Sequence, residues 1–140
     1  MDSTENYPRP SVAADAAVFG IAEQKATDPK ALRPRTLNIL LVQRGAEPFR
    51  GLYSLPGGFL RPGETIEQAA CRELTEETGV VQPRIIPLKA YSAPHRDPRG
   101  WVVSCAFLGL TRTVRLSTAE GSDAAGAQWF DLSYMQEKKH

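Results

Sequence analysis

The apolar residues of this 140-residue chain fall into short runs that are bounded by glycine, proline and polar residues. Runs of this length, rich in β-branched and aliphatic residues, are typical of β-strands. A first strand is predicted over Val12–Ile21 and a second over Leu37–Val42, where the unbroken run Ile39–Val42 favours burial on both faces. Further strands are predicted over Ile85–Ser92, Trp101–Leu110 and Ala127–Leu132.

Loops are predicted where glycine, proline and small polar residues gather. Residues 22–35 and 117–126 are of this kind, and residues 44–60 hold enough glycine and proline to leave at most one short strand, near Tyr53–Leu55. Pro87 lies within a predicted strand and indicates an edge strand or a bulge, because proline cannot donate to the ladder. The last eight residues are expected to start a helix.

One helix is marked clearly in the middle of the chain. Thr65 is expected to cap its start, because Gln68 three residues later completes a capping box, and Gly79 is a natural stop. On a helical wheel, the face that is apolar in the first half of the helix becomes acidic in the second half, at Glu73 and Glu77. Several strands around one central helix indicate a layered domain of the α/β or α+β class.

Three glutamates crowd the C-terminal half of this helix: Glu73, Glu76 and Glu77. Carboxylates three or four residues apart repel each other by roughly a few tenths of a kcal/mol, and negative charge near a helix C-terminus costs about 0.3–1 kcal/mol. A bound Mg²⁺ or Mn²⁺ would offset both costs, because these ions take carboxylate oxygens together with substrate phosphates. The alternative is a solvated, charged helix face, which is the usual meaning of a glutamate-rich run.

Residues just before the helix could complete such a metal site. Glu64 supplies another carboxylate, and the backbone carbonyls of Gly57 and Gly58 can come close to a ligand because these residues lack a Cβ. Arg72 can pair with Glu76, four residues on, or hold the neighbouring carboxylates in position.

Composition narrows the class of protein. The chain has 17 Lys and Arg residues against 16 Asp and Glu residues, a net charge of +1 that gives no support to binding of nucleic acid or of a membrane surface. The polar start of the chain is not typical of a signal peptide, and no apolar run approaches the roughly 20 residues of a membrane helix. Cys71 and Cys105 form no ligand cluster and are interpreted as reduced thiols. We expect a cytoplasmic protein with a flexible lead over residues 1–10 and a single domain over residues 11–140.

The full spacing of the helix and its preceding loop carries a family resemblance. From Gly58 to Val80 the chain reads Gly-x5-Glu-x7-Arg-Glu-Leu-x-Glu-Glu-x-Gly-Val, which resembles the signature box of the Nudix hydrolases without a substitution. The resemblance implies a mixed β-sheet sandwiched between helices, with the box as a loop–helix–loop metal site. It also implies Mg²⁺-dependent hydrolysis of a nucleoside diphosphate linked to another moiety, with Mn²⁺ as a substitute ion.

The resemblance also assigns roles within the box. The metal ligands that it implies are Gly58, Glu64, Glu73, Glu76 and Glu77. Among these, Gly58 would bind through its carbonyl and Glu64 through a water molecule, while Arg72 would orient the carboxylates. A carboxylate must also take the proton of the attacking water. The candidates, from the box and from the predicted loop over residues 117–126, are Glu73, Glu77, Glu120 and Asp123.

A second stretch resembles a narrower group. Arg96–Gly100 reads Arg-Asp-Pro-Arg-Gly, as in many ADP-ribose pyrophosphatases and in Nudix-related regulators of NAD metabolism, and Glu47–Phe59 is similar to the same group. The candidate phosphate contacts are Arg44, Arg50, Arg96 and Arg99, although a single surface arginine is more often solvated. Because Arg96 and Arg99 flank a turn, a clasp across that turn is an equal alternative. Trp101 stands where many relatives have histidine or arginine; its indole either stacks on a substrate base or packs in the core, and packing is favoured.

Three functions are compatible with the resemblance. Hydrolysis of ADP-ribose to AMP and ribose 5-phosphate is the leading hypothesis, because it agrees with both the box and the Arg96–Gly100 stretch. Hydrolysis of oxidised nucleoside triphosphates is permitted equally by the box. The third is an ADP-ribose-sensing regulator that binds DNA, but such relatives carry a winged-helix segment for which no room is expected after Leu132. A small nucleotide is the expected partner, nucleic acid is not, and relatives often form homodimers.

Overall fold

The computed structural model describes residues 3–23, 30, 35–81, 83–112 and 126–137. In chain order, its elements are the 3-10 turn η1 (Thr4–Asn6), β1 (Ser11–Glu23), β2 (Arg35–Gln43), β3 (Tyr53–Ser54), β4 (Gly57–Phe59), α1 (Ile66–Thr78), β5 (Ile85–Tyr91), β6 (Val102–Thr111), β7 (Ala127–Asp131) and α2 (Leu132–Glu137). The strands predicted from the apolar runs are confirmed, and their bounds agree with these to within two residues. The predicted loop over residues 117–126 lies outside the described residues except at its last position.

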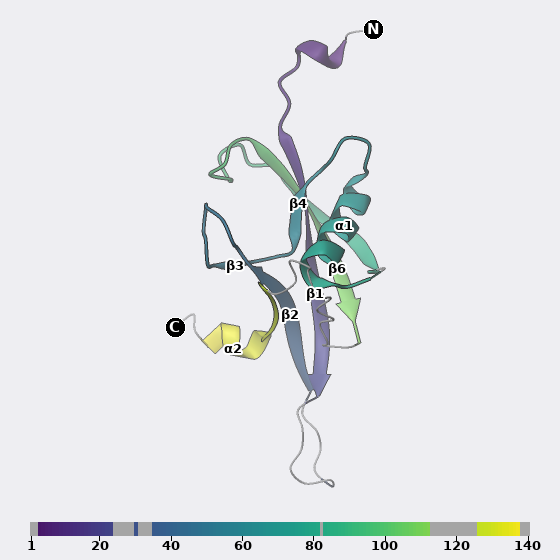
Figure 1. The fold of residues 1–140 in the computed structure, drawn as a ribbon, viewed down its shortest axis with the longest axis vertical. Coiled ribbons are helices and arrows are strands. Elements are labelled where there is room, and N and C mark those ends of the chain that lie inside the picture. Colours follow the sequence, from purple (N-terminus) through teal and green to yellow (C-terminus); the bar gives the residue numbers. More distant parts are fainter. Residues whose placement is uncertain (1–2, 24–29, 31–34, 82, 113–125, 138–140) are drawn as a thin grey trace.

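β1 runs through the middle of a mixed, seven-stranded sheet (Figure 1). The strand order is β3-β2-β1-β6-β5, and two further strands join it because β4 pairs with β1 and β7 pairs with β2. β1 is parallel to β6 and antiparallel to β2 and β4. The sheet is therefore mixed, as the family resemblance implies.

The expectation for β2 needs correction, because this strand is not buried on both faces. Asn38, Leu40 and Val42 are buried, whereas Ile39 and Leu41 between them are only partly buried. Leu40 and Val42 belong to the core cluster, so one face of the strand meets the core and the other is covered less completely. The alternation is that of a half-buried strand despite the continuous aliphatic sequence.

The glycine-rich segment before α1 forms two short strands, β3 and β4, rather than at most one. β4 lies against β1, and a Cβ at Gly57 would overlap the Asp15 side chain and the backbone carbonyl of Ala14. Only glycine lets the backbone approach this closely. The glycines that favoured the prediction of a loop are therefore required for the pairing of β4 with β1. The prediction for Pro87 is confirmed, since β5 ends the strand order and its register shifts between Pro87 and Lys89.

α1 begins and ends as predicted. The Thr65 hydroxyl accepts from the backbone N–H of Gln68 over 3.1 Å, and the Gln68 side chain accepts from the backbone N–H of Thr65 over 2.9 Å. Gly79 ends the helix in the left-handed conformation, with φ of 77°. The buried apolar residues of α1 are Ala69, Ala70 and Leu74. Two of these are small, and they let α1 pack against β1 and β4, with Glu73 and Glu77 next to the glycines of β4.

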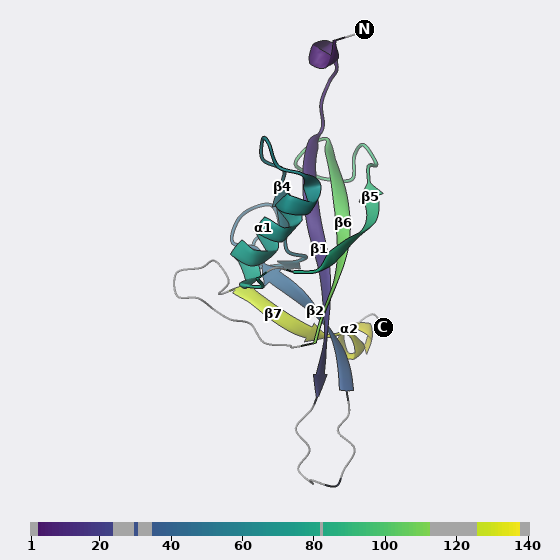
Figure 2. The ribbon, with the colours of Figure 1, turned by 90° about the vertical axis from the view of Figure 1, so that its right-hand side faces the viewer.

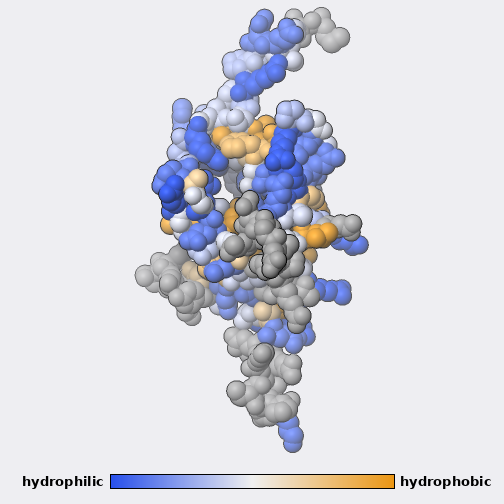
Figure 3. Space-filling view, viewed as in Figure 1, coloured by the Kyte–Doolittle hydropathy of each residue, from blue (hydrophilic) through white to orange (hydrophobic). Residues whose placement is uncertain are grey.

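The chain beyond β7 also starts a helix, as expected. α2 packs against β2 and β7, and Figure 2 shows α1 and α2 on opposite sides of β1. Among the residues that the structure describes, no helix is long and apolar enough to cross a membrane. The face shown in Figure 3 is predominantly hydrophilic, with hydrophobic residues in small separate groups.

Candidate active site

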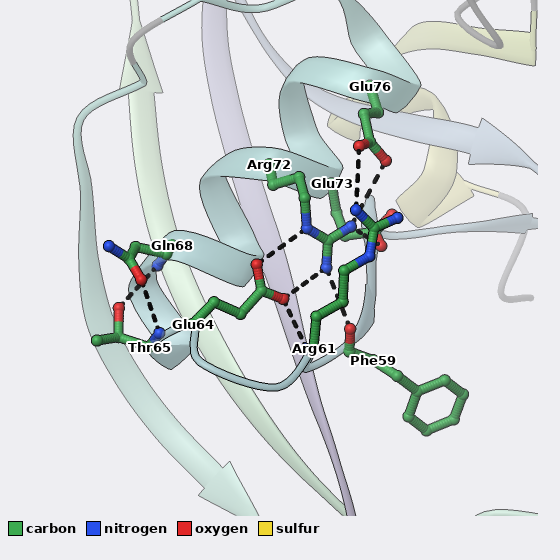
Figure 4. A network of polar contacts seen from close by, with 8 residues as sticks. All are labelled: Phe59, Arg61, Glu64, Thr65, Gln68, Arg72, Glu73 and Glu76. Carbon is green, nitrogen blue, oxygen red and sulfur yellow. Dashed lines mark hydrogen bonds and ion pairs between the residues drawn. The ribbon is translucent and has the colours of Figure 1, made fainter.

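Arg72 ties the loop before α1 to the helix (Figure 4). Its Nε donates to Oε2 of Glu64 over 3.0 Å, and its Nη2 donates to Oε1 of Glu64 over 2.7 Å. Nη2 also donates to the carbonyl of Phe59 over 3.1 Å, and the backbone N–H of Arg61 donates to Glu64 over 2.8 Å. The hydrogen bonds from Arg72 lower the pKa of Glu64 to about 2. Glu64 is therefore an anion that anchors the loop to the helix.

The same guanidinium orients the acids of the helix. Nη1 of Arg72 donates to Oε1 of Glu73 over 2.6 Å and lies 3.5 Å from Oε2 of Glu76. The Glu76 side chain is 50% exposed, and its second partner, Arg61, is 3.9 Å away. The predicted pairing of Arg72 with Glu76 is present, but its contact with Glu73 is shorter and better buried. The structure thus brings together Glu64, Arg72 and Glu73 most tightly.

Glu77 is held from the sheet rather than by an arginine. The backbone N–H of Gly57 on β4 donates to Oε1 of Glu77 over 3.0 Å. Burial raises the pKa of Glu77 to about 7, and the nearby carboxylates of Glu73 and Asp15 add to this effect while the hydrogen bond from Gly57 opposes it. An acid with a raised pKa beside other acids is typical of a site that is completed by a positive charge.

Gly58 lies directly against the carboxylate of Glu73. A Cβ at position 58 would overlap the carboxylate atoms, so this close approach needs glycine. The carboxylate oxygens of Glu73 and Glu77 and the carbonyl of Gly58 are ligands of the kind that Mg²⁺ and Mn²⁺ prefer. Within the described part of the chain, no three acidic, histidine or cysteine side chains are grouped closely enough to hold a metal ion as they stand. The donor chemistry fits a hard divalent cation, but side chains would have to converge on it.

A cavity of about 450 Å³ lies beside these acids and is lined by Glu77, Gly57 and Gly58. Asp15 of β1 also lines it, and this residue was not among those predicted from the sequence. Burial raises the pKa of Asp15 to about 6, against the lowering effect of Arg96 and Arg99. The sequence does hold one indication of a role for Asp15. It is an acid within a predicted strand of small and apolar residues, and an acid is rarely buried in such a strand without a function.

The chain matches the family described as the NUDIX domain over residues 27–140. The protein belongs to the NUDIX family. The signature box of the family is the loop and helix from Gly58 to Val80, and the structure shows how Arg72, β1 and β4 hold that box together.

Three relatives place this NUDIX domain more closely. An ADP-ribose pyrophosphatase of Methanocaldococcus jannaschii is 44% identical over 95 residues, which make up 68% of this chain and 55% of that protein. An ADPR responsive transcriptional repressor, NtrR, of Acinetobacter baylyi is 32% identical over 107 residues, or 75% of this chain and 38% of that protein. The solved NUDIX domain of Shewanella oneidensis NrtR complexed with ADP ribose has a TM-score of 0.74 at 29% identity, with 97% of this chain and 82% of that chain covered. The chain thus spans about half or less of these curated relatives' lengths.

Two of the four predicted phosphate-binding arginines line the cavity of this NUDIX domain. Arg44 lies there with its Nε donating to the carbonyl of Pro48 over 2.7 Å. Arg99 lies there too, over the ring of Phe59 at 4.7 Å. Arg50 is exposed and does not line the cavity.

The alternative of a clasp across the turn is realised for Arg99. Its Nε and Nη2 donate to the Asp97 carboxylate over 3.0 and 2.8 Å, and its backbone N–H donates to the same side chain over 2.9 Å. These bonds lower the pKa of Asp97 to about 2. Arg96 instead donates to the hydroxyl of Ser104 on β6 over 2.6 Å. Arg99 therefore both closes the turn and borders the cavity, whereas Arg96 is anchored on the sheet.

The favoured expectation that Trp101 packs in the core is wrong. The residue is 46% exposed and lines a separate hollow, together with Pro94, His95 and Pro98. Trp101 precedes β6, and the buried positions of that strand begin with Val102. The loop acids proposed as alternative bases, Glu120 and Asp123, lie outside the described residues.

Proposed function

We propose that this NUDIX domain hydrolyses the pyrophosphate bond of ADP-ribose, in the presence of Mg²⁺, to give AMP and ribose 5-phosphate. The observation that carries the proposal is the joint placement of the box acids and the nucleotide-sized cavity, with Glu77 belonging to both. The 44% identical relative that is an ADP-ribose pyrophosphatase supports the choice of substrate.

The side chains divide the work according to charge. Arg44 and Arg99 at the cavity offer positive charge to the phosphates of the substrate. Glu73, Glu76, Glu77 and the carbonyl of Gly58 are the groups that would hold Mg²⁺, and Mn²⁺ suits the same oxygens. When bound, the ion supplies neutralisation of the phosphates and a more acidic water molecule.

Within the chain, Arg72 keeps Glu73 in place and Gly57 keeps Glu77 in place. Glu73 and Glu77 are proposed to take the proton of the attacking water, with Glu120 as the alternative. Glu77 is the acid of the box that also lines the cavity, which supports a carboxylate of the box for this role.

A substrate panel tests this proposal directly. ADP-ribose, ADP-glucose, NADH and 8-oxo-dGTP would each be incubated with Mg²⁺, with Mn²⁺ and with EDTA, and the products separated by chromatography. We expect AMP and ribose 5-phosphate from ADP-ribose, and no turnover in EDTA. No turnover of ADP-ribose together with fast release of pyrophosphate from 8-oxo-dGTP would favour the second hypothesis, sanitation of oxidised nucleotides.

A sensing role is the third candidate function, and it is supported by one of the relatives, which is an ADPR responsive repressor. In that case the chain would bind ADP-ribose without cleaving it. Calorimetry with ADP-ribose in EDTA, combined with the turnover assay, separates binding from hydrolysis. DNA binding that survives raised salt would support the regulator, since nonspecific contacts are lost as salt rises. The oligomeric state, monomer or homodimer, is measured in the same preparation by light scattering.

A further inference from the structure

Asp15 lines the cavity with a carboxylate that accepts no hydrogen bond from the described residues. It lies near the middle of β1, opposite Gly57 in the strand register, and it lines the cavity beside Glu77. Among the described residues, no group donates a hydrogen bond to its carboxylate, and neither Arg96 nor Arg99 forms an ion pair with it.

The other acids around the site are all engaged. Glu64 and Glu73 accept hydrogen bonds from Arg72, Glu77 accepts one from Gly57, and Glu76 pairs with Arg72. Asp97 is clasped by Arg99. Within the described site, Asp15 is thus the exception, because its carboxylate forms neither a hydrogen bond nor an ion pair.

A half-buried carboxylate without a donor is costly. Burial raises its pKa to about 6, which shows that the folded protein disfavours its charged form. Such a group is retained where a ligand supplies the missing hydrogen bonds.

The walls of the cavity show which part of a nucleotide would supply the donors. Arg44 and Arg99 are matched to phosphates, which have no donors to give Asp15. Among the described lining residues Phe59 is the one aromatic, and Arg99 already covers a face of its ring, so a base finds little to stack on. A ribose offers two neighbouring hydroxyls, and a carboxylate commonly accepts from such a diol in nucleotide sites.

We propose that Asp15 binds the hydroxyls of a substrate ribose and makes the site selective for nucleotides that carry an intact ribose next to the cleaved pyrophosphate. The inference rests on the proposed function, since it adds a specificity residue to that reaction. Asp15 and Glu77 line the same cavity, so a pyrophosphate bound at the box acids has its adjoining sugar within the space that Asp15 borders.

The test compares substrates and variants together. Asp15→Asn and Asp15→Ala would be assayed with ADP-ribose, with its 2′-deoxyadenosine analogue and with an analogue that carries 2-deoxyribose in place of the terminal ribose. Wild type should lose about tenfold in kcat/KM with one of the two deoxy analogues, and each variant should lose about tenfold with ADP-ribose. In each variant, kcat/KM should be the same for ADP-ribose and for that analogue, because the contact between residue 15 and the ribose hydroxyl is already missing. The affected analogue identifies the ribose that Asp15 binds.

Matched controls keep the result interpretable. Glu23→Gln removes an exposed charge at the far end of the same strand. It should leave the kcat/KM for ADP-ribose, and its ratio to that for each deoxy analogue, unchanged. Asp15→Asn is close in shape to the wild type and should melt no lower than it, because an unpaired charge has been removed. Equal loss on all three substrates, or a raised Mg²⁺ requirement with unchanged selectivity, would overturn the proposal in favour of a catalytic or metal-binding role.

A binding measurement separates this proposal from the proposed function. Calorimetry with AMP and with ribose 5-phosphate requires no hydrolysis. If ADP-ribose is not cleaved, Asp15→Asn must still weaken the binding of one of these two ligands about tenfold for the ribose contact to stand. Wild-type affinity of both variants for both ligands would reject it whatever the enzyme assay shows.

Discussion

The backbone N–H of Gly57 donates to Oε1 of Glu77 over 3.0 Å, and this bond joins β4 to the last acid of α1. A Cβ at Gly57 would overlap Asp15 on the neighbouring strand. The position of Glu77 therefore depends on α1, on β4 and on β1, which is distant from the other two in the sequence. Its carboxylate is fixed from the strand side, whereas that of Glu73 is fixed by Arg72.

Glu77→Gln should abolish most hydrolysis while leaving the fold intact. The amide oxygen can still accept from Gly57, but the negative charge that a cation or a proton needs is lost. We expect kcat/KM on ADP-ribose to fall by about 100-fold or more at saturating Mg²⁺. Glu67→Gln, which removes an exposed charge in the first turn of the same helix, is the control. Near-normal turnover by Glu77→Gln, with an unchanged Mg²⁺ requirement, would exclude Glu77 from the metal site.

Gly58→Ala should damage the site more than the fold. The added Cβ would overlap the Glu73 carboxylate, which must then turn away from its position beside Arg72. Turnover of ADP-ribose should drop at least about tenfold, with a melting temperature close to that of wild type. Gly126→Ala is a suitable control, because a Cβ there meets its neighbours at 3.4 Å or more. Full activity of Gly58→Ala would show that the approach of Gly58 to Glu73 is not used in catalysis.

Without a divalent cation, the protein should lose stability as the pH rises from about 4 to about 7. Folding raises the pKa of Asp15 from 3.8 to about 6 and that of Glu77 from 4.5 to about 7, mainly through burial. For an acid with a raised pKa, the stabilisation is fully present below the unfolded-state value and disappears as the pH passes the folded-state value. Arg96 and Arg99 limit the effect at Asp15, whereas Asp97 and Glu73 increase it.

Urea unfolding in EDTA at pH 4.5, 6 and 7.5 measures this loss. For Asp15 alone it should amount to at most about 3 kcal/mol, the value of a shift of about two pKa units. Asp15→Asn should flatten the profile over this range, and Mg²⁺ should restore stability at the highest pH because it favours the ionised acids. A free energy of unfolding that rises with pH in EDTA would contradict the assignment of both residues. Glu64 has a lowered pKa, so its stabilisation is present above about pH 4.5 and is lost as the pH falls from there toward 2.

The parts of the site that follow local rules were predictable from the sequence, and the parts that depend on strand pairing were not. The capping box at Thr65 and the crowding of Glu73, Glu76 and Glu77 each involve residues within two helical turns, so sequence separation alone places them. Asp15 depends on the pairing of β1 with β4, which the loop-like glycines of that segment concealed. Trp101 was assigned to the core on hydrophobicity, but it lies outside the strand whose alternation decides burial.

Arg72→Lys should impair the site although the charge is kept. A lysine cannot reproduce the two parallel hydrogen bonds to Glu64 while also holding Glu73, because it lacks the planar fork of arginine. We expect at least about a tenfold loss in kcat on ADP-ribose and faster amide exchange in the loop before α1, which Glu64 no longer anchors. Arg61→Lys is the matched control, since its pair with Glu76 is long, at 3.9 Å, and exposed, and such pairs contribute about 0–1 kcal/mol. Equal effects of the two substitutions would show that charge alone, and not the forked contact from Arg72, organises the carboxylates of the box.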